Sequence, residues 1–318
     1  LAGKAYENGR GLVALNSLSH FQNDEYNLDR FINLNLGPSL LLSGDIFRKV
    51  GFFNRAISKY KVALQWCGDM RLKGAVAGLG GDGGSVTNDE GVLVFNTRSS
   101  TTKVFLNRDI SDGGILKIQT VENERGALIP KMLDFELTTI ERNAKILIGR
   151  ALIEDARSKT QGYSTTAFAG KLYEKAVGHF VALLEPMSLN DYSSIPFRLE
   201  LLRASIELAR YKNRLKHGGM SEAVMDYALC VSNAESFMRM VEAISNVNEI
   251  EDDGMSFMGG EAIRNASEVA YILVESLFEI GRADQAFDAF SRHYSSAKED
   301  DPWAVLAMLK LAEHYIEK

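Results

Sequence analysis

Apolar residues recur at intervals of three and four positions along most of the chain, which is the spacing of amphipathic helices. Most intervals between these periodic segments are short and contain Gly, Ser, Asn or Asp. Short connections make consecutive helices antiparallel neighbours. The pattern predicts helices at residues 3–20, 38–50, 53–67, 133–158, 165–185, 196–216, 220–246, 258–280, 283–296 and 302–317.

The pattern changes between residues 70 and 130. Glycines cluster at 74–84, and short apolar runs typical of β-strands follow them. These runs are VLVF at 92–95, KVFL at 103–106 and ILKIQTV at 115–121, and polar turn sequences separate them. We therefore expect a Gly-rich linker and a small antiparallel β insertion between two helical blocks.

Three glycines of the cluster, Gly78, Gly80 and Gly83, have the spacing G-x-G-x-x-G. In a dinucleotide site this motif follows a buried strand and opens a helix whose N–H groups face the pyrophosphate. Here a helical pattern precedes the glycines, a turn and a strand follow them, and residues 98–108 lack the expected acidic side chain. A flexible linker is the favoured interpretation. The alternative is a small-molecule-binding, nucleotide-binding or enzymatic protein that uses this loop and the β insertion.

Glycine and alanine mark the helical pair at 40–64. Gly44 precedes Gly51 by seven positions, and Ala56 and Tyr60 follow at fixed offsets. This pattern resembles the tetratricopeptide repeat, a helix–turn–helix of about 34 residues. The resemblance implies that Gly44 lets the two helices approach closely and that Gly51 ends the first helix. It also implies that Ala56 lies where the helices pack nearest.

Three further segments resemble the same repeat. At 270–290, Gly281 and Ala286 hold the equivalent places and Val274 replaces the first glycine. In the segment marked by Ala223, the preceding helix carries Arg210 and Arg214 where apolar residues are expected. The markers of these other two segments are Tyr173, Ala176 and Phe180, and Ala223, Tyr227 and Cys230.

The alanines that mark the four segments are separated by 120, 47 and 63 residues, so the array is irregular. The expected fold is mainly α, an irregular tetratricopeptide-like solenoid of antiparallel helical hairpins with a small antiparallel β insertion. An irregular helical bundle is the alternative, because Gly and Ala also mark ordinary close helix packing. The expected divisions are repeat-like helices at 1–69, the Gly-rich linker and β insertion at 70–130, and a C-terminal helical solenoid at 131–318.

Residue types that carry chemistry form no recognisable catalytic or metal-binding pattern. The five histidines include no i, i+4 pair, and no H-E-x-x-H, G-x-S-x-G or Walker A sequence occurs. Cys67 and Cys230 are interpreted as small buried side chains, with a disulfide or a catalytic thiol as alternatives. We expect a protein that is not an enzyme, with no catalytic, cofactor-binding or metal-ligating residues.

The charge balance bears on the class of partner. There are 36 Lys and Arg against 42 Asp and Glu, a net charge of −6, which argues against nucleic-acid binding. No apolar stretch reaches the roughly 20 residues that cross a bilayer. Acidic runs at 249–254 and 298–302 are interpreted as solvated loops, with contact to a basic partner as the alternative.

Because the chain starts at Leu1 without Met, removal of a targeting segment stays open, and the compartment is undetermined with a slight preference for the cytoplasm.

Stacked helical repeats form an extended groove that binds a peptide or a helix. We therefore expect a non-enzymatic scaffold or adaptor that binds a protein partner in a multiprotein assembly. In one subclass of the resembled family, Lys and Asn on the first helix of a repeat clamp a terminal carboxylate. The matching positions here carry Leu41 and Asp45, and Tyr271 and Glu275. Asp45 and Glu275 are predicted to contact a basic or helical partner.

Overall fold

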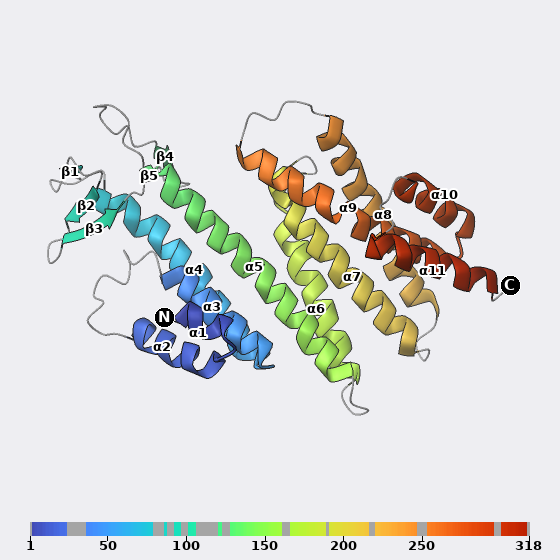
Figure 1. The fold of residues 1–318 in the computed structure, drawn as a ribbon, viewed down its shortest axis with the longest axis horizontal. Coiled ribbons are helices and arrows are strands. Elements are labelled where there is room, and N and C mark those ends of the chain that lie inside the picture. Colours follow the sequence, from blue (N-terminus) through green and yellow to red (C-terminus); the bar gives the residue numbers. More distant parts are fainter. Residues whose placement is uncertain are drawn as a thin grey trace. The chain divides into compact units, whose positions relative to one another are not determined.

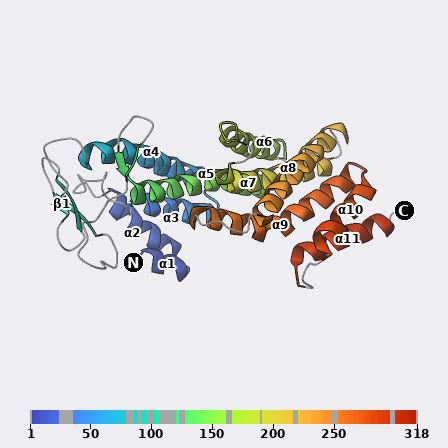
Figure 2. The ribbon, with the colours of Figure 1, turned by 90° about the horizontal axis from the view of Figure 1, so that it is seen from above.

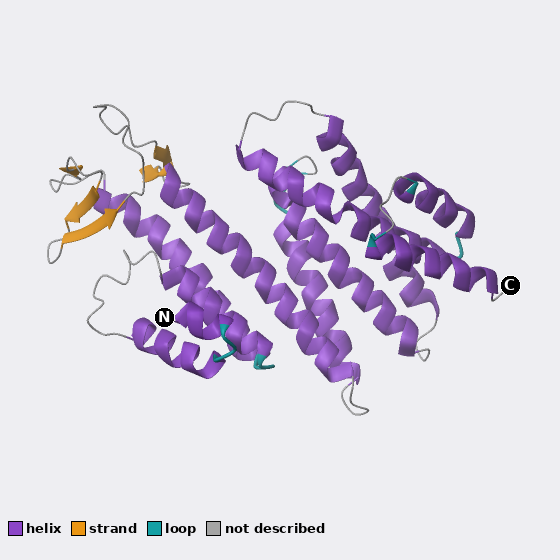
Figure 3. Ribbon diagram, viewed as in Figure 1, coloured by secondary structure: helices purple, strands orange, loops and turns teal. Residues whose placement is uncertain are grey.

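The structure, a computed structural model, contains eleven α-helices, one short 3₁₀ helix and five short β-strands within the residues it describes (Figures 1 and 3). Helices dominate, so the expectation of a mainly α chain is confirmed. Helices that follow one another in the sequence pack as neighbours, which is compatible with a helical solenoid. The described residues are 2–23, 36–78, 86–87, 92–96, 101–105, 120–122, 128–160, 166–188, 191–215, 220–246, 253–295 and 300–316.

The chain divides into two compact units, unit 1 at residues 1–151 and unit 2 at residues 152–318. The division falls within α5 (Lys131–Thr160). A small apolar core joins the N-terminal helices of unit 1 through Ala14, Leu18 and Ile46. The helices that precede α5 in unit 1 are α1 (Ala2–Glu7), α2 (Gly11–Asn23), α3 (Leu36–Lys49) and α4 (Phe53–Gly78).

The α3–α4 hairpin is closed by a glycine and an aromatic ring. A Cβ atom on Gly44 would lie 2.2 Å from Cε1 of Tyr60, so only glycine leaves room for this ring. Tyr60 and Ala56 are fully buried against α3. Gly51 ends the turn with φ of +83°, a conformation that other residues adopt at a cost. The roles that the sequence pattern implied for Gly44 and Gly51 agree with this geometry.

Helix α4 extends well beyond the end expected near residue 67. It continues through Gly68 to Gly78, so residues 70–78 of the predicted linker are helical. Met70 is buried, and Arg71 bonds to carboxylates of α5. Tertiary contacts of this type outweigh the helix-weakening effect of glycine, which is about 1 kcal/mol per residue.

Short strands occupy part of the segment between α4 and α5. β1 (Val86–Thr87), β2 (Val92–Asn96) and β3 (Thr101–Phe105) form an antiparallel sheet in that order. β4 (Thr120–Glu122) pairs antiparallel with β5 (Leu128–Pro130) (Figure 3). The third predicted strand was 115–121, and residues 115–119 of it lie outside the described residues. A β insertion as a structural unit stays a prediction.

Unit 2 is a series of packed helices (Figure 2), and a large apolar core joins several of them. The core takes buried residues from α7 through α11, such as Leu202, Phe237 and Val274. Close approach also occurs between α6 and α7, where a Cβ on Gly170 would lie 2.9 Å from the ring of Tyr211. The elements after α5 are α6 (Thr166–Leu184), η1 (Tyr192–Ser194), α7 (Ile195–Leu215), α8 (Met220–Asn246), α9 (Asp253–Glu279), α10 (Ala283–Tyr294) and α11 (Pro302–Ile316).

The α9–α10 hairpin has the same turn as α3–α4. Gly281 has φ of +77°, and Ala286 is fully buried at the helix seam. Val274 is also fully buried and fills the place that the first glycine holds in the other hairpin. The remaining repeat markers are buried as well, on α6 and α8: Tyr173, Ala176, Phe180, Ala223, Tyr227 and Cys230.

Candidate partner-binding surface

Asp45, one of the two predicted partner contacts, lies on α3 and bonds within its own hairpin. Its Oδ1 accepts a hydrogen bond from the Tyr60 hydroxyl at 3.0 Å and from Nη2 of Arg48 at 3.2 Å. The side chain is 31% exposed. Burial raises the pKa of Tyr60 above its usual value, and the nearby Asp45 charge adds to this effect, so the hydroxyl stays a donor.

Glu275, the other predicted contact, lies on α9 and bonds to a different helix. Arg210 of α7 donates from Nε to Oε1 at 2.8 Å and from Nη2 to Oε2 at 2.5 Å. Only 7% of the Glu275 side chain is exposed. Burial lowers the pKa of Arg210, but the bonds and charge of Glu275 outweigh it and the net shift is upward. The guanidinium also lies 6.0 Å from the ring centroid of Tyr271.

A second pair of the same form lies seven residues earlier on both helices. Arg203 of α7 donates to Glu268 of α9 at 2.8 and 2.5 Å, and also to Glu200 at 2.6 Å. One heptad is about two helical turns, so the two Arg–Glu pairs lie on the same face of each helix. We call Arg203–Glu268 and Arg210–Glu275 the α7–α9 ladder.

The α7–α9 ladder explains an irregularity in the sequence. Arg210 stands where the repeat pattern expects an apolar residue, and it serves to bind Glu275. Arg214, the other irregular arginine, is exposed. Sequence reasoning missed the ladder, although the seven-residue spacing of Arg203 and Arg210, and of Glu268 and Glu275, was a visible signal. Partner binding by Asp45 and Glu275 stays a prediction.

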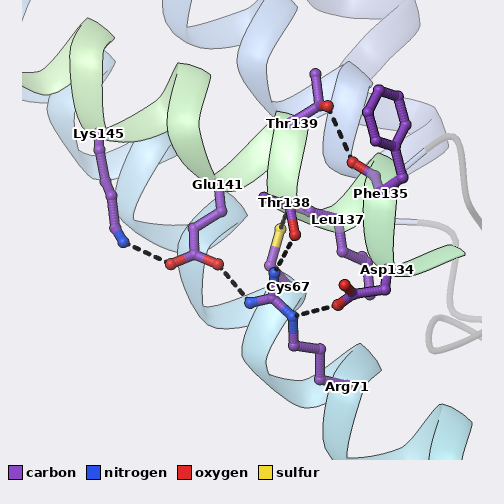
Figure 4. A network of polar contacts seen from close by, with 9 residues as sticks. All are labelled: Cys67, Arg71, Asp134, Phe135, Leu137, Thr138, Thr139, Glu141 and Lys145. Carbon is purple, nitrogen blue, oxygen red and sulfur yellow. Dashed lines mark hydrogen bonds and ion pairs between the residues drawn. The ribbon is translucent and has the colours of Figure 1, made fainter. Parts of the chain in front are cut away.

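A polar network in unit 1 joins α4 to α5 (Figure 4). Arg71 bonds to Asp134 at 3.3 Å, to the Thr138 hydroxyl at 3.0 Å and to Glu141. Lys145 donates to the other oxygen of Glu141 at 2.6 Å. Burial raises the pKa of Glu141, but Lys145 and Arg71 outweigh it and the net shift is downward. The Glu141 carboxylate is held charged by its partners, and the whole network is the arrangement of a structural brace.

Each unit contains one buried cysteine, and both are free thiols. Burial raises the pKa of Cys67 and of Cys230 to about 12. The Cys67 thiol lies 3.7 Å from the carbonyl oxygen of Leu137, to which it donates (Figure 4). Within the described ranges, no group of three or more His, Cys, Asp or Glu side chains is placed to hold a metal ion.

The glycine motif falls mostly outside the described residues. Gly78 is the last residue of α4, and Gly80 and Gly83 belong to the gap before β1. A helix therefore precedes the motif and a strand follows it, which is the reverse of the order in a dinucleotide site.

None of the described helices combines the length and hydropathy needed to cross a bilayer.

Exposed apolar side chains gather on α11, a feature that the sequence interpretation did not single out. Their exposed fractions range from 41% for Leu306 to 85% for Ile316. Scattered exposed apolar residues are normal, whereas a contiguous set on one helix marks an interaction surface. The large apolar side chains of this surface are Val305, Leu306, Met308, Leu309, Tyr315 and Ile316.

No protein-family model matches the chain, and no curated protein is significantly similar to it. The resemblance to the tetratricopeptide repeat therefore depends on the helical hairpins and their glycine, alanine and aromatic residues. Without a family assignment, the structure supports a series of packed helices that is compatible with a solenoid.

Proposed function

We propose that this chain is a non-enzymatic scaffold or adaptor that binds a peptide or helix of a protein partner in a multiprotein assembly. The proposal includes an irregular tetratricopeptide-like organisation of the helices, with the strands between residues 86 and 130 as a small insertion. Arrays of stacked helices present extended faces, and such faces accommodate peptides and helices.

The observation that carries this proposal is the repeated closure of the helical hairpins. Gly51 and Gly281 end the first helix of their hairpins with positive φ, and each is followed five residues later by a fully buried alanine, Ala56 or Ala286. One packing solution used twice in a chain is the expected property of a repeat array. In such arrays each unit contacts its neighbours, which leaves long surfaces available to partners.

The predicted contact residues enter the proposal to different degrees. Asp45 is about one-third exposed, so its carboxylate can accept from a Lys or Arg of a partner while it keeps the Tyr60 bond. Glu275 is buried with both oxygens on Arg210, and a partner would have to replace that guanidinium. Asp45 is therefore the more accessible of the two.

The alternative function is a nucleotide or other small-molecule site that uses the glycine loop and the strands. The order of elements around the glycines gives this alternative no support, because the helix lies before Gly78. A thermal-shift screen with nucleotides tests it directly. Binding that is lost in Gly80→Ala and Gly83→Ala variants with unchanged helix content would replace the scaffold proposal.

Affinity purification of the full chain from its native source, followed by mass spectrometry and cross-linking, tests the scaffold proposal. The expected result is a stoichiometric protein partner cross-linked to helical residues. Asp45→Asn removes the charge but keeps an oxygen for Tyr60, and Glu136→Gln is a matched change at an exposed position of the same unit. A monomer that retains a small molecule or shows turnover, and no protein partner, would contradict the proposal.

A further inference from the structure

Helix α11 has two apolar sides, of which one is packed and the other is exposed. Ala304, Ala307 and Leu311 are buried in the core of unit 2 or against it. Figure 2 shows α11 as the last helix at the edge of this unit, with α9 and α10 beside it. The residues on the side of α11 opposite the buried ones are Val305, Leu309, Ala312 and Ile316, all exposed.

The exposed residues of α11 are spaced by four, three and four positions. This is the spacing of the seam along which two helices pack side by side. Leu306 and Met308 widen the seam on its two flanks. The neighbouring helix α10 has an ordinary solvent-facing side, whose exposed residues are Asp284, Gln285, Asp288, Ser291 and Arg292.

We propose that the exposed seam of α11 binds an amphipathic helix of a partner protein that carries Lys or Arg beside its apolar stripe. The inference rests on the proposed scaffold function and adds the binding surface and the chemistry of its partner. A helix fits because its apolar residues repeat at the same three- and four-residue intervals as those of α11.

Charge around the seam specifies a basic partner. Lys310 is the sole Lys or Arg between residues 302 and 316, and it lies 3.2 Å from Glu279 and 3.6 Å from Glu313. Two carboxylates therefore share one cation, and Asp300 adds an exposed negative charge at the start of the helix. The Glu313 side chain is 66% exposed, so it is accessible to a cation of the partner.

A second copy of this chain fits the seam less well. In a parallel pair of α11 helices, Glu313 of each copy would lie beside Met308 of the other and would meet no cation. In an antiparallel pair with Val305 opposite Ile316, Glu313 lies on the flank of Leu306 of the other copy, and neither arrangement brings a cation to Glu313 or to Asp300. An anionic lipid surface is also disfavoured, because it would repel the acidic flank.

The test uses the full chain and a designed helical peptide of about three heptads with a leucine stripe and Lys on its flanks. A matched peptide has Glu in place of Lys. We expect the Lys peptide to bind at least about fivefold more tightly than the Glu peptide, because each exposed ion pair contributes only modestly. Hydrogen exchange should show protection centred on residues 302–316.

Two variants locate the binding surface. Leu309→Glu places a charge in the seam and should weaken Lys-peptide binding by about thirtyfold or more. Met225→Glu changes an apolar residue of α8 that is more exposed than Leu309, and it should leave binding unchanged. Circular dichroism confirms that both variants are folded, which exposed positions allow.

Four outcomes would overturn the inference. They are equal binding of the two peptides, protection away from α11, dimerisation that Leu309→Glu abolishes, and binding to anionic vesicles in place of the peptide. Failure here is distinguishable from failure of the scaffold function. A native partner whose retention survives Leu309→Glu leaves the scaffold proposal intact and removes α11 as its site. Peptide binding without any native partner would count against the scaffold alone.

Discussion

The two hairpins α3–α4 and α9–α10 share a turn but differ in how their helices meet. In both turns the glycine N–H bonds to the carbonyl three residues earlier, at 3.0 Å for Gly51 and 2.9 Å for Gly281. The interior contact differs, because Gly44 admits the ring of Tyr60 whereas the equivalent Val274 fills the space itself. Local backbone chemistry therefore determines the turn, and side-chain volume across the seam determines the packing.

The carboxylates that follow these positions show the same divergence. Asp45 bonds to Arg48 and Tyr60 within its own hairpin, whereas Glu275 bonds to Arg210 on the preceding hairpin. Equivalent places in a repeat pattern can thus stabilise one hairpin or link two of them. Position alone does not determine whether such a carboxylate faces a partner.

The largest difference between the hairpins should come from removing these carboxylates. Glu275→Ala leaves the partly buried Arg210 guanidinium with Glu207 at 3.1 Å as its remaining carboxylate partner, so we expect a loss of about 3 kcal/mol in the free energy of unfolding. Asp45→Ala should cost about 1 kcal/mol, because its side chain is partly solvated. Urea unfolding measures both, and equal costs would contradict the comparison.

The next difference concerns side-chain volume at the seam. Gly44→Ala should cost about 2.5 kcal/mol, because the new Cβ overlaps the Tyr60 ring. Val274→Ala should cost about 2 kcal/mol for the opposite reason, a cavity. In a Tyr60→Ala background, Gly44→Ala should have little further effect on unfolding. A full additional cost there would show that the ring is not what excludes the methyl group.

Replacing the turn glycines should change the free energy of unfolding by similar amounts in the two hairpins. Gly51→Ala and Gly281→Ala force alanine into the left-handed region and should each cost about 1 kcal/mol, since no neighbouring atoms obstruct the new methyl group. Gly68→Ala is the control, because this helical glycine also has open space around it and should gain up to about 1 kcal/mol. Thermal unfolding of the three variants tests whether the two turns are equivalent.

The smallest expected effect is a pH dependence confined to α9–α10. Burial lowers the pKa of His293, Arg292 lowers it further, and Glu242 opposes the shift. The unfolded chain binds this proton near pH 6.5, whereas the folded chain binds it only at lower pH. The contribution of His293 to the free energy of unfolding is therefore present above about pH 6.5. It is lost as the pH falls through the lower pKa that His293 has in the folded chain.

Urea midpoints of unit 2 at neutral and mildly acidic pH measure this dependence. His293→Gln should remove that part of the acid destabilisation and leave the contribution of the carboxylates. An unchanged pH profile in the variant would show that His293 does not contribute. No corresponding change is expected for α3–α4, which contains no histidine between residues 36 and 78.

The sequence predicted long periodic helices well and local interruptions poorly. Helix α8 matches its expected bounds, and α5 differs by two residues at each end, because their apolar periodicity is sustained. The helix expected at 3–20 is instead two helices, separated at Gly9 with φ of +74°. A single glycine does not reveal from sequence whether it continues a helix, as Gly68 does, or ends one.

The interaction residues were harder to predict than the helices. The repeat pattern placed Glu275 at a position associated with ligand contact, but its partner Arg210 lies 65 residues away and no local pattern connects them. The α11 seam was visible as apolar spacing, yet spacing alone does not distinguish a buried side from an exposed one. Packing of Ala304, Ala307 and Leu311 against the rest of unit 2 decides which side is left open.

Each unit contains a single buried thiol, so the reactivity of the two cysteines can report whether the two units unfold independently. Cys67 belongs to unit 1 and Cys230 to unit 2, and with a pKa of about 12 neither is nucleophilic while its unit stays folded. A thiol reagent added in native conditions therefore labels each cysteine only when that unit opens. Two distinct labelling rates would show that the units unfold separately, and one common rate would show that they unfold together.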